Sequence, residues 1–507
     1  MPEAAADVFD FVVVGGGSAG CVLAARLSED PGAQVLLLEA GPADPPQAAA
    51  VPAAWPTLLQ GPACWGEFTT AQAATGTSPF LPRGRVLGGS SAINAMIFAR
   101  GHRTSYDPWA GTGAKGWGFE DLLPYFQRSE NAPGRDPSVR GARGPLTVGP
   151  AAPANEALLA CLDAAVDTGY RRADDISGGL EEGFAPCDLN IVDGRRQSAA
   201  DAYLSPALGR PNLTVVTGAL VHRLHVESGR ATGLAYTLGS EQVSVACRQE
   251  VVLAAGAIGS AQLLMLSGIG PQSHLTEAGI SVVQDLPGVG ENLHDHPTAS
   301  LVYASPRPVP AGHHNHGEIF GLVRSPFAES GPDLQILFID VPPPLPGFAA
   351  PQSGFTIQVS PMTPHSRGSV RLAGPSAATP PVLDPNYLGD ERDLDVLVSG
   401  LRMAREIAGS CALDGWRGEE VAPGPAVQDD AGLRAYARTT LASYCHPVGT
   451  CAMGEHLLAV VDSSLRVHGI DGLRVADGSV LPSIPSANTN ATVYAVAERA
   501  AELISRR

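Results

Sequence analysis

The N-terminal stretch places the strongest constraint on the fold, because it combines a strand, a glycine turn, a helix and a second strand that ends on an acid. The apolar residues 9–14 lead into the run GGGSAG, in which Gly15, Gly17 and Gly20 fill the three places of GxGxxG. These glycines allow a tight turn, close approach of the backbone to a pyrophosphate, and helix–strand packing. A helix expected over 21–28 would direct its N-terminal N–H groups at a phosphate, with Ser18 and Ala19 at the turn.

The second strand of this unit, predicted over 35–38, ends at Glu39, nineteen residues after Gly20. A carboxylate at this distance can accept hydrogen bonds from ribose hydroxyls, and it would repel a 2′-phosphate. The complete context predicts a dinucleotide site. The motif by itself does not distinguish FAD from NAD.

Composition narrows the class of protein. A chain of 507 residues is longer than one core usually serves, so two or three structural units are expected. The net charge of −18 disfavours nucleic acid and anionic membranes as partners. The chain has no uninterrupted apolar run long enough to predict a membrane span. Its N-terminus lacks the basic region of a signal peptide, so we expect a cytoplasmic protein. The eight cysteines form no CxxC, and no metal site is expected.

Stretches with helical periodicity and stretches with strand patterns follow one another along the chain. The Gly- and Pro-rich stretch 131–153 indicates a boundary, after which 155–168 has helical periodicity. Strands are predicted at 213–216, 220–226, 231–237, 243–247 and 250–255, the last ending in small residues that can pack against the same cofactor. Further strands at 334–339, 355–359 and 369–372 favour a mainly antiparallel sheet covered by helices.

We therefore predict an α/β protein with a Rossmann-type nucleotide-binding domain and a second, discontinuous substrate domain. The nucleotide-binding domain is expected over 1–153, 205–297 and 445–507, and the substrate domain over 154–204 and 298–444.

The C-terminal stretch holds a histidine and two asparagines that could carry chemistry. His446 lies in the run YCHPVGT, where proline and glycine favour a rigid turn, and Asn488 and Asn490 follow later. Taken alone, His446 is more simply a structural histidine and Asn488 a turn residue.

Several separated motifs change this interpretation, because together they resemble the glucose-methanol-choline (GMC) oxidoreductases. The resemblance is carried by residues 83–96, 256–271, the run VGENLHDH at 289–296, and His446 to Gly449 with Asn488, in addition to the N-terminal fingerprint. It extends over nearly the whole chain. It implies an FAD domain, a smaller substrate domain and a buried flavin whose N5 faces a histidine with a His or Asn partner.

The same resemblance implies the site residues. His446 is the expected base and Asn488 its partner, with Asn490 as the close competitor for the partner role. An imidazole with a pKa near 6.5 can accept an alcohol proton while the α-hydrogen leaves as hydride, and an amide can stabilise the developing alkoxide. The residues expected to contact the cofactor are Gly15, Gly17, Ser18, Ala19, Gly20, Glu39, Trp65, Val86, Gly89, Asn94, Ala95, Met96, Val221, Asp477, Gly478 and Asn490.

The flavin linkage departs from part of the family. Some members attach FAD through a histidine in the first signature, where this chain has Ile93 before Asn94, so non-covalent FAD is expected.

The function expected from these residues is the oxidation of a primary alcohol, aryl or furanic in character, to the aldehyde, with O2 as the acceptor. The first alternative is a choline-type dehydrogenase that passes electrons to a quinone or another acceptor. An alternative from another class is a hydroxynitrile-lyase-like flavoprotein, since such lyases share the scaffold. A non-catalytic flavoprotein is disfavoured because both catalytic positions are filled.

Other residues receive structural interpretations first. The run HHNH at 313–316 is favoured as a solvated or lid loop, and His294 and His296 as structural residues of a turn. Pocket roles for Phe338 and Arg367 are left open, and Cys445 is interpreted as a small residue that leaves room for a substrate.

Overall fold

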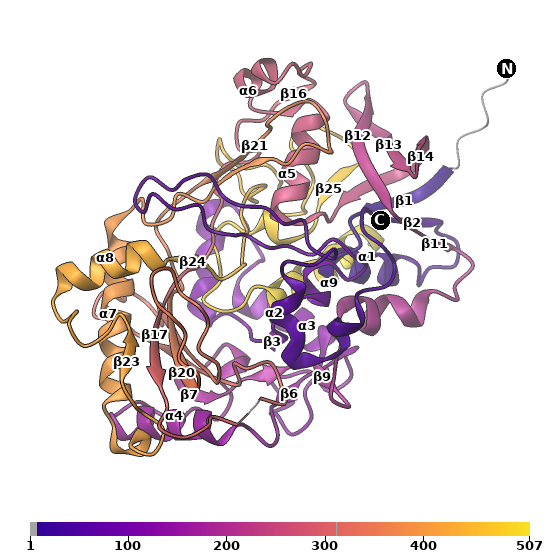
Figure 1. Cartoon of the computed structure of the whole chain (residues 1–507). Helices are drawn as coiled ribbons and strands as arrows, with labels where there is room; N and C mark the ends of the chain where they lie inside the picture. The colour runs from indigo at the N-terminus through magenta and orange to yellow at the C-terminus, as the bar shows by residue number, and fades with distance from the viewer. Residues whose placement is uncertain (1–7, 311, 507) are drawn as a thin grey trace.

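Two seven-stranded sheets organise the computed structural model, which describes residues 8–310 and 312–506. In Figure 1 the strands β1, β2 and β11–β14 lie at the upper right, and β17, β20 and β23 lie at the lower left beside α7 and α8. The α/β fold class is thereby confirmed. The N-terminal residues that bear on a signal peptide lie outside the described residues.

The first sheet has the order β11-β2-β1-β14-β13-β12, with β25 paired to β14. Its strands are β1 (Val8–Val14), β2 (Val35–Glu39), β11 (Leu213–Thr217), β12 (Ala219–Glu227), β13 (Arg230–Leu238), β14 (Glu241–Leu253) and β25 (Leu473–Val475). The strands β11, β2, β1, β14 and β25 pair in parallel, whereas β12, β13 and β14 pair antiparallel. Three stretches far apart in sequence therefore build one nucleotide-binding sheet.

The prediction of two strands over 243–247 and 250–255 was wrong. These residues form the single strand β14, because its first half pairs with β13 while its second half continues alongside β1. The strand continues through the polar residues Arg248 and Gln249, where its pairing with β1 shifts register between Cys247 and Glu250.

Helices α1 (Ser18–Leu27) and α9 (Asn490–Ser505) pack against each other beside the first sheet, and α3 (Phe119–Ser129) packs on α9. Helix α1 begins at Ser18, three residues before the predicted start, directly after the glycine turn. A Cβ on Gly20 would lie 1.8 Å from the carbonyl oxygen of Gly15, so only glycine allows this helix to start so close to the strand.

The second sheet is antiparallel, as predicted, with the order β23-β17-β20-β19-β18-β7 and with β24 paired to β17. Its strands are β7 (Gly183–Pro186), β17 (Pro297–Ala304), β18 (Ile319–Val323), β19 (Leu334–Ile339), β20 (Gly354–Pro361), β23 (Glu420–Ala422) and β24 (Ala442–Ser443). Helices α4 (Glu156–Asp167), α7 (Glu391–Ala408) and α8 (Asp430–Thr440) pack on this sheet.

Alternation along β20 separates the two faces of this sheet. Phe355, Ile357 and Val359 are fully buried in the core shared with the helices. Gln358 lies between them in sequence and lines a cavity on the opposite face. The sheet therefore has one face for the helices and one for the cavity.

One predicted strand belongs elsewhere. Residues 369–372 were expected in the antiparallel substrate sheet, but β21 (Ser369–Arg371) pairs with β22 (Val382–Asp384), and Val370 lies in the core of the first sheet. The domain boundaries stay predictions. In the described part of the chain, no helix combines the length and apolar character needed to cross a membrane.

Candidate active site

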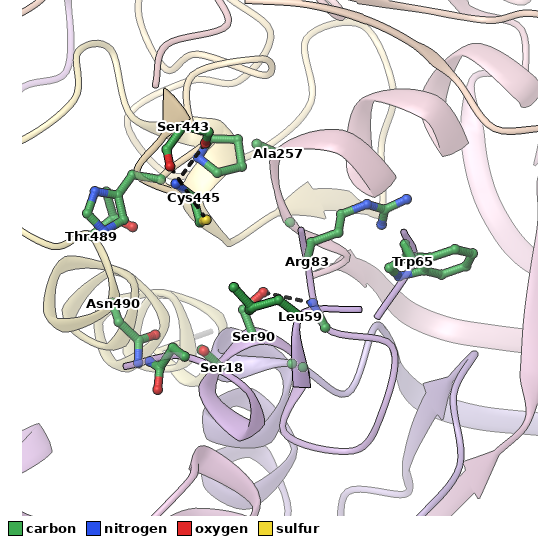
Figure 2. Close-up of a pocket in the computed structure, with 18 of the residues that line it drawn as sticks. Ser18, Leu59, Trp65, Arg83, Ser90, Ala257, Ser443, Cys445, Thr489 and Asn490 are labelled. Atoms are coloured by element: carbon green, nitrogen blue, oxygen red, sulfur yellow. Dashed lines mark hydrogen bonds between the residues drawn. The ribbon is translucent and has the colours of Figure 1, made fainter. Parts of the chain in front are cut away.

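A cavity of about 780 Å³ is lined by residues of both sheets. Figure 2 shows part of its wall, with Ser443 and Cys445 of the C-terminal segment opposite Ser18 and Ser90. Most predicted site residues line it: Gly15, Gly17, Ser18, Ala19, Glu39, Trp65, Gly89, Asn94, Ala95, Met96, Val221, His446, Asp477, Gly478, Asn488 and Asn490. Residues from five separate stretches of sequence therefore meet at one site.

Gly20 and Val86 are not among the residues that line the cavity. Gly20 is in close contact with the backbone of Gly15, which matches the packing role that the third glycine of the motif was expected to have. Val86 is fully buried in a small apolar cluster with Leu58, Ala92 and Ile93. A contact between Val86 and the cofactor stays a prediction.

The glycine turn is held by Glu39. The backbone N–H groups of Gly16 and Gly41 donate hydrogen bonds of 2.8 Å to its two carboxylate oxygens. Burial raises the pKa of Glu39, and the two N–H donors oppose that rise. Glu39 thus lines the cavity and also fixes the turn beside it, a second role that the spacing of the motif did not predict.

The opposite end of the nucleotide half is built around Asp477. One oxygen accepts hydrogen bonds from Gly256 N–H at 2.8 Å and Ser260 Oγ at 2.6 Å, and the other accepts from Ser479. The carboxylate therefore ties the N-terminus of α5 (Gly256–Leu266) to the C-terminal segment. Gly256 has a φ of +76° and open space where a Cβ would lie. The N-termini of α1 and α5 both reach the cavity.

His446, the predicted base, has a partner on each ring nitrogen. Its Nε2 lies 3.2 Å from Nδ2 of Asn488, and its Nδ1 lies 2.9 Å from Nδ1 of His296. The other nitrogen of His296, Nε2, lies 3.2 Å from the carbonyl oxygen of Met362. His296 was interpreted as structural, so its contact with His446 is a finding that the sequence reasoning missed.

These contacts determine where the protons sit. The Met362 carbonyl can only accept, so Nε2 of neutral His296 carries the proton and donates. Nδ1 of His296 then accepts a hydrogen bond from Nδ1–H of His446. Nε2 of His446 is left with a lone pair, to which the Asn488 amide donates. This is the tautomer that a general base requires.

Asp295 anchors both histidines through the backbone. Its Oδ1 accepts hydrogen bonds from the N–H of His446 at 2.8 Å and of His296 at 2.9 Å. Its Oδ2 accepts from the hydroxyls of Tyr387 and Ser443. Burial raises the pKa of Asp295 to about 6, against the lowering effect of these four donors.

Burial also sets the protonation of His446. The side chain is 8% exposed, and desolvation lowers its pKa to about 3. The sequence interpretation assumed the ordinary value near 6.5. In the structure the imidazole is neutral throughout the physiological range, so it is available as a proton acceptor.

The two candidate asparagines have different surroundings. Asn488 is buried beside His446, and its Oδ1 has no hydrogen-bond partner among the described residues. Asn490 begins α9 and donates from Nδ2 to the hydroxyl of Tyr494 at 3.3 Å. The structure therefore brings Asn488 within hydrogen-bonding distance of His446, and its role as the partner of the substrate oxygen stays a prediction.

The structure also shows where Phe338, Arg367, Cys445 and the HHNH run lie relative to the cavity. Phe338 is buried in the second core and stacks on Phe184, and neither it nor Arg367 lines the cavity. Cys445 does line it. His316, from the HHNH run, hydrogen-bonds through Nδ1 to Asp340 at 2.7 Å and through Nε2 to the Ala53 carbonyl at 2.9 Å.

The cavity residues that sequence reasoning missed include several from the second sheet and from the segment around α2 (Trp55–Leu58). Trp55, Leu337, Ile339 and Gln358 all line the cavity. Alternation along the strands could have identified Leu337 and Gln358, but only once the face of the sheet that meets the cavity was known.

Comparison with known proteins agrees with this arrangement. Family models described as GMC oxidoreductase match residues 9–298 and 364–497. An oxygen-dependent choline dehydrogenase from Brucella canis is 40% identical, covering 98% of this chain and 96% of that protein.

Solved structures give the same result. Pyridoxine 4-oxidase from Mesorbium loti superposes with a TM-score of 0.94 and 38% identity, covering 97% of this chain and 98% of that one. A fungal aryl-alcohol oxidase superposes with a TM-score of 0.85 and 27% identity, covering 98% and 99%.

Proposed function

Because the chain belongs to the GMC oxidoreductases, FAD-dependent enzymes that act on CH–OH groups, we propose that it oxidises a primary alcohol borne on an aromatic or furanic ring to the aldehyde, with O2 as the acceptor. The observation that carries this proposal is the lone pair of His446 Nε2, fixed at the cavity wall beside the amide of Asn488.

The cavity has the features that FAD requires. The N-termini of α1 and α5 offer backbone N–H groups to a pyrophosphate, and the closely approaching glycines leave room for it. We assign Gly17 and Ser18 to the pyrophosphate, Glu39 to the ribose, and Asp477 with Gly478 to the flavin end. When bound, FAD supplies the acceptor for the hydride that leaves the alcohol carbon.

The protein residues divide the rest of the work. Nε2 of His446 takes the hydroxyl proton of the alcohol, and Asn488 donates a hydrogen bond to the oxygen as negative charge develops. His296 and the Met362 carbonyl hold the proton on the far nitrogen of His446. Removing either donor or acceptor from such a site typically costs a few kcal/mol of barrier.

The cavity wall supports a ring-bearing substrate. Trp55, Leu337, Ile339 and Leu345 line it, and Tyr444 lies against His446 with ring centroids 4.5 Å apart. Flat and apolar surfaces of this kind suit an aromatic alcohol. The names of the pyridoxine oxidase and the aryl-alcohol oxidase point the same way.

We further propose that FAD is held without a covalent bond. Ile93, at the position where some relatives carry the linking histidine, is a buried aliphatic residue that cannot form the link. Acid precipitation of the holoenzyme should release yellow flavin into the supernatant. Colour kept in the washed pellet would overturn this part of the proposal.

Anaerobic mixing of the holoenzyme with a panel of primary alcohols tests the main proposal. Bleaching of the flavin by ring-bearing alcohols supports it, and rapid recovery of the colour on admitting air supports O2 as the acceptor. If the colour returned slowly in air but quickly on adding a quinone, a choline-type dehydrogenase would be favoured. This second candidate is supported by the 40% identity to the Brucella protein. A flavin that no alcohol bleaches would favour a lyase.

A further inference from the structure

The charges on the cavity wall are distributed unevenly. Among the described residues that line the cavity, the carboxylates are Glu39 and Asp477. Both lie in the half built from the first sheet and the C-terminal segment, and both already accept several hydrogen bonds from the protein. The half built from the second sheet, where the alcohol must lie to reach His446, has no carboxylate on its described wall.

The surface of that second-sheet half is largely apolar, with a few polar side chains and no carboxylate among its described residues. Leu337, Ile339 and Leu345 supply much of its surface. Thr298 donates from its hydroxyl to the carbonyl of Ala442 at 3.2 Å, so this hydroxyl already has an acceptor. The Gln358 amide lines the cavity and makes no side-chain hydrogen bond within the described chain. This amide therefore offers a polar atom of the substrate both a donor and an acceptor.

The carboxylates behind this wall include Asp295, Glu318 and Asp340, which are all buried and do not line the cavity. Asp340 does not line the cavity, and its Oδ1 is hydrogen-bonded to Nδ1 of His316, which does; this contact raises the pKa of His316. Asp295 is 4% exposed behind His446 and accepts hydrogen bonds from four donors. A cation in the second-sheet half of the cavity would therefore meet no carboxylate among the described residues of that wall.

The aromatic residues do not replace the missing anion. Cations are bound between several aromatic faces when no carboxylate is present. Figure 2 shows Arg83 beside Trp65, whose ring already has the guanidinium groups of Arg83 and Arg85 at 4.4 and 4.8 Å from its centroid. Tyr444 lies against His446. Trp55 remains, and one ring does not form a cage.

We infer, resting on the proposed function, that the enzyme selects a neutral alcohol, that Gln358 binds a hydrogen-bonding group on its ring, and that quaternary ammonium alcohols such as choline are excluded. Moving a trimethylammonium group from water to this wall removes its hydration without supplying a partner. The neutral tert-butyl group of the same shape meets no such cost.

Matched pairs of alcohols test this inference on the holoenzyme. The first pair is choline and 3,3-dimethylbutan-1-ol, and the second is 4-(trimethylammonio)benzyl alcohol and 4-tert-butylbenzyl alcohol. We expect the neutral member of each pair to reduce the flavin with a second-order rate constant on the order of a hundredfold or more above that of its cationic twin. Perturbation of the flavin absorbance on binding should show the same order of affinity.

Two variants examine the role of Gln358. Gln358→Glu keeps the shape of the side chain and adds the missing anion, so it should narrow the preference for the neutral twin by about tenfold or more. Gln358→Leu removes the amide without adding charge and should keep that preference, while weakening binding of alcohols with a ring nitrogen or hydroxyl relative to their hydrocarbon analogues.

The outcomes separate this inference from the proposed function. A wild-type enzyme that is reduced equally well by the cationic and neutral twins would overturn the inference and leave alcohol oxidation intact. Preferential binding of the neutral twins without any reduction of the flavin would support the inference and overturn the proposed function.

Discussion

Nδ1 of His296 lies 2.9 Å from Nδ1 of His446, with the two rings nearly perpendicular at 89°. Since the Met362 carbonyl accepts the single ring proton of neutral His296, this contact fixes the tautomer of His446 and leaves the lone pair on Nε2, beside the amide of Asn488. In the proposed mechanism His296 is therefore a positioning residue, which acts on the substrate through His446.

Replacement of His296 should slow flavin reduction by an amount that depends on whether the new side chain can accept a hydrogen bond from Nδ1–H of His446. His296→Ala removes the acceptor for Nδ1–H of His446, so the rate should fall on the order of ten- to a hundredfold. His296→Asn places an amide oxygen near the same position and should restore most of the lost rate. Equal rates for the two variants in stopped-flow reduction, with equal FAD content, would argue for a structural role alone.

Asn488→Ala should slow reduction about ten- to a thousandfold, because it removes the donor to the developing alkoxide and leaves His446 in place. Asn490→Ala is the matched control, since its amide donates to Tyr494 instead. A larger loss for Asn490→Ala than for Asn488→Ala would reassign the partner.

Glu39→Ala should weaken FAD binding by about ten- to a hundredfold, in line with the loss of charge-assisted hydrogen bonds worth about 1.5–3 kcal/mol. In Glu39→Ala the N–H groups of Gly16 and Gly41 also lose the acceptor that Glu39 provides. The apoprotein of this variant should therefore unfold at a lower temperature than the wild-type apoprotein. Glu39→Gln, which keeps an oxygen acceptor, should lose less of both. Titration of apoprotein with FAD measures the first effect, and an unchanged affinity in Glu39→Ala would refute the ribose assignment.

The lowered pKa of His446 predicts an unusual pH profile. A group with a pKa of about 3 stays neutral as the pH falls from 8 to 5, so the rate of flavin reduction should not decline through protonation of the base. A histidine of ordinary pKa would lose about tenfold of its neutral form between pH 7.5 and 5.5. The nearby Asp295 carboxyl has a pKa of about 6 and can add its own inflection. Asp295→Asn is the control, and a limb near pH 6.5 that survives in this variant would contradict the account.

Local sequence pattern was sufficient for the N-terminal strand–turn–helix–strand unit. The turn at Gly15 to Gly20 and the acid at Glu39 act within one continuous strand–helix–strand unit, so their spacing determines their arrangement. The resemblance to a known family added His446 and Asn488, and the structure brings them within hydrogen-bonding distance.

What the sequence could not predict depends on contacts between distant elements. His296 directly precedes β17, and the pairing of β17 with β24 together with the bridge between His294 and Val448 brings it next to the segment that carries His446. The pKa of His446 follows from burial by both sheets. Gln358 could be assigned to a face of β20 by alternation. The residues of the opposing cavity wall come from several loops without fixed motifs, so the sequence could not identify them.

The most direct test of the central claim is anaerobic stopped-flow reduction of the wild-type holoenzyme and of His446→Ala by the same ring-bearing primary alcohol. The account predicts that the variant keeps a near-normal FAD content and is reduced on the order of a hundredfold or more slowly, with a rate that rises as the alcohol ionises at high pH. Reduction of His446→Ala at the wild-type rate would contradict the proposed mechanism of alcohol oxidation.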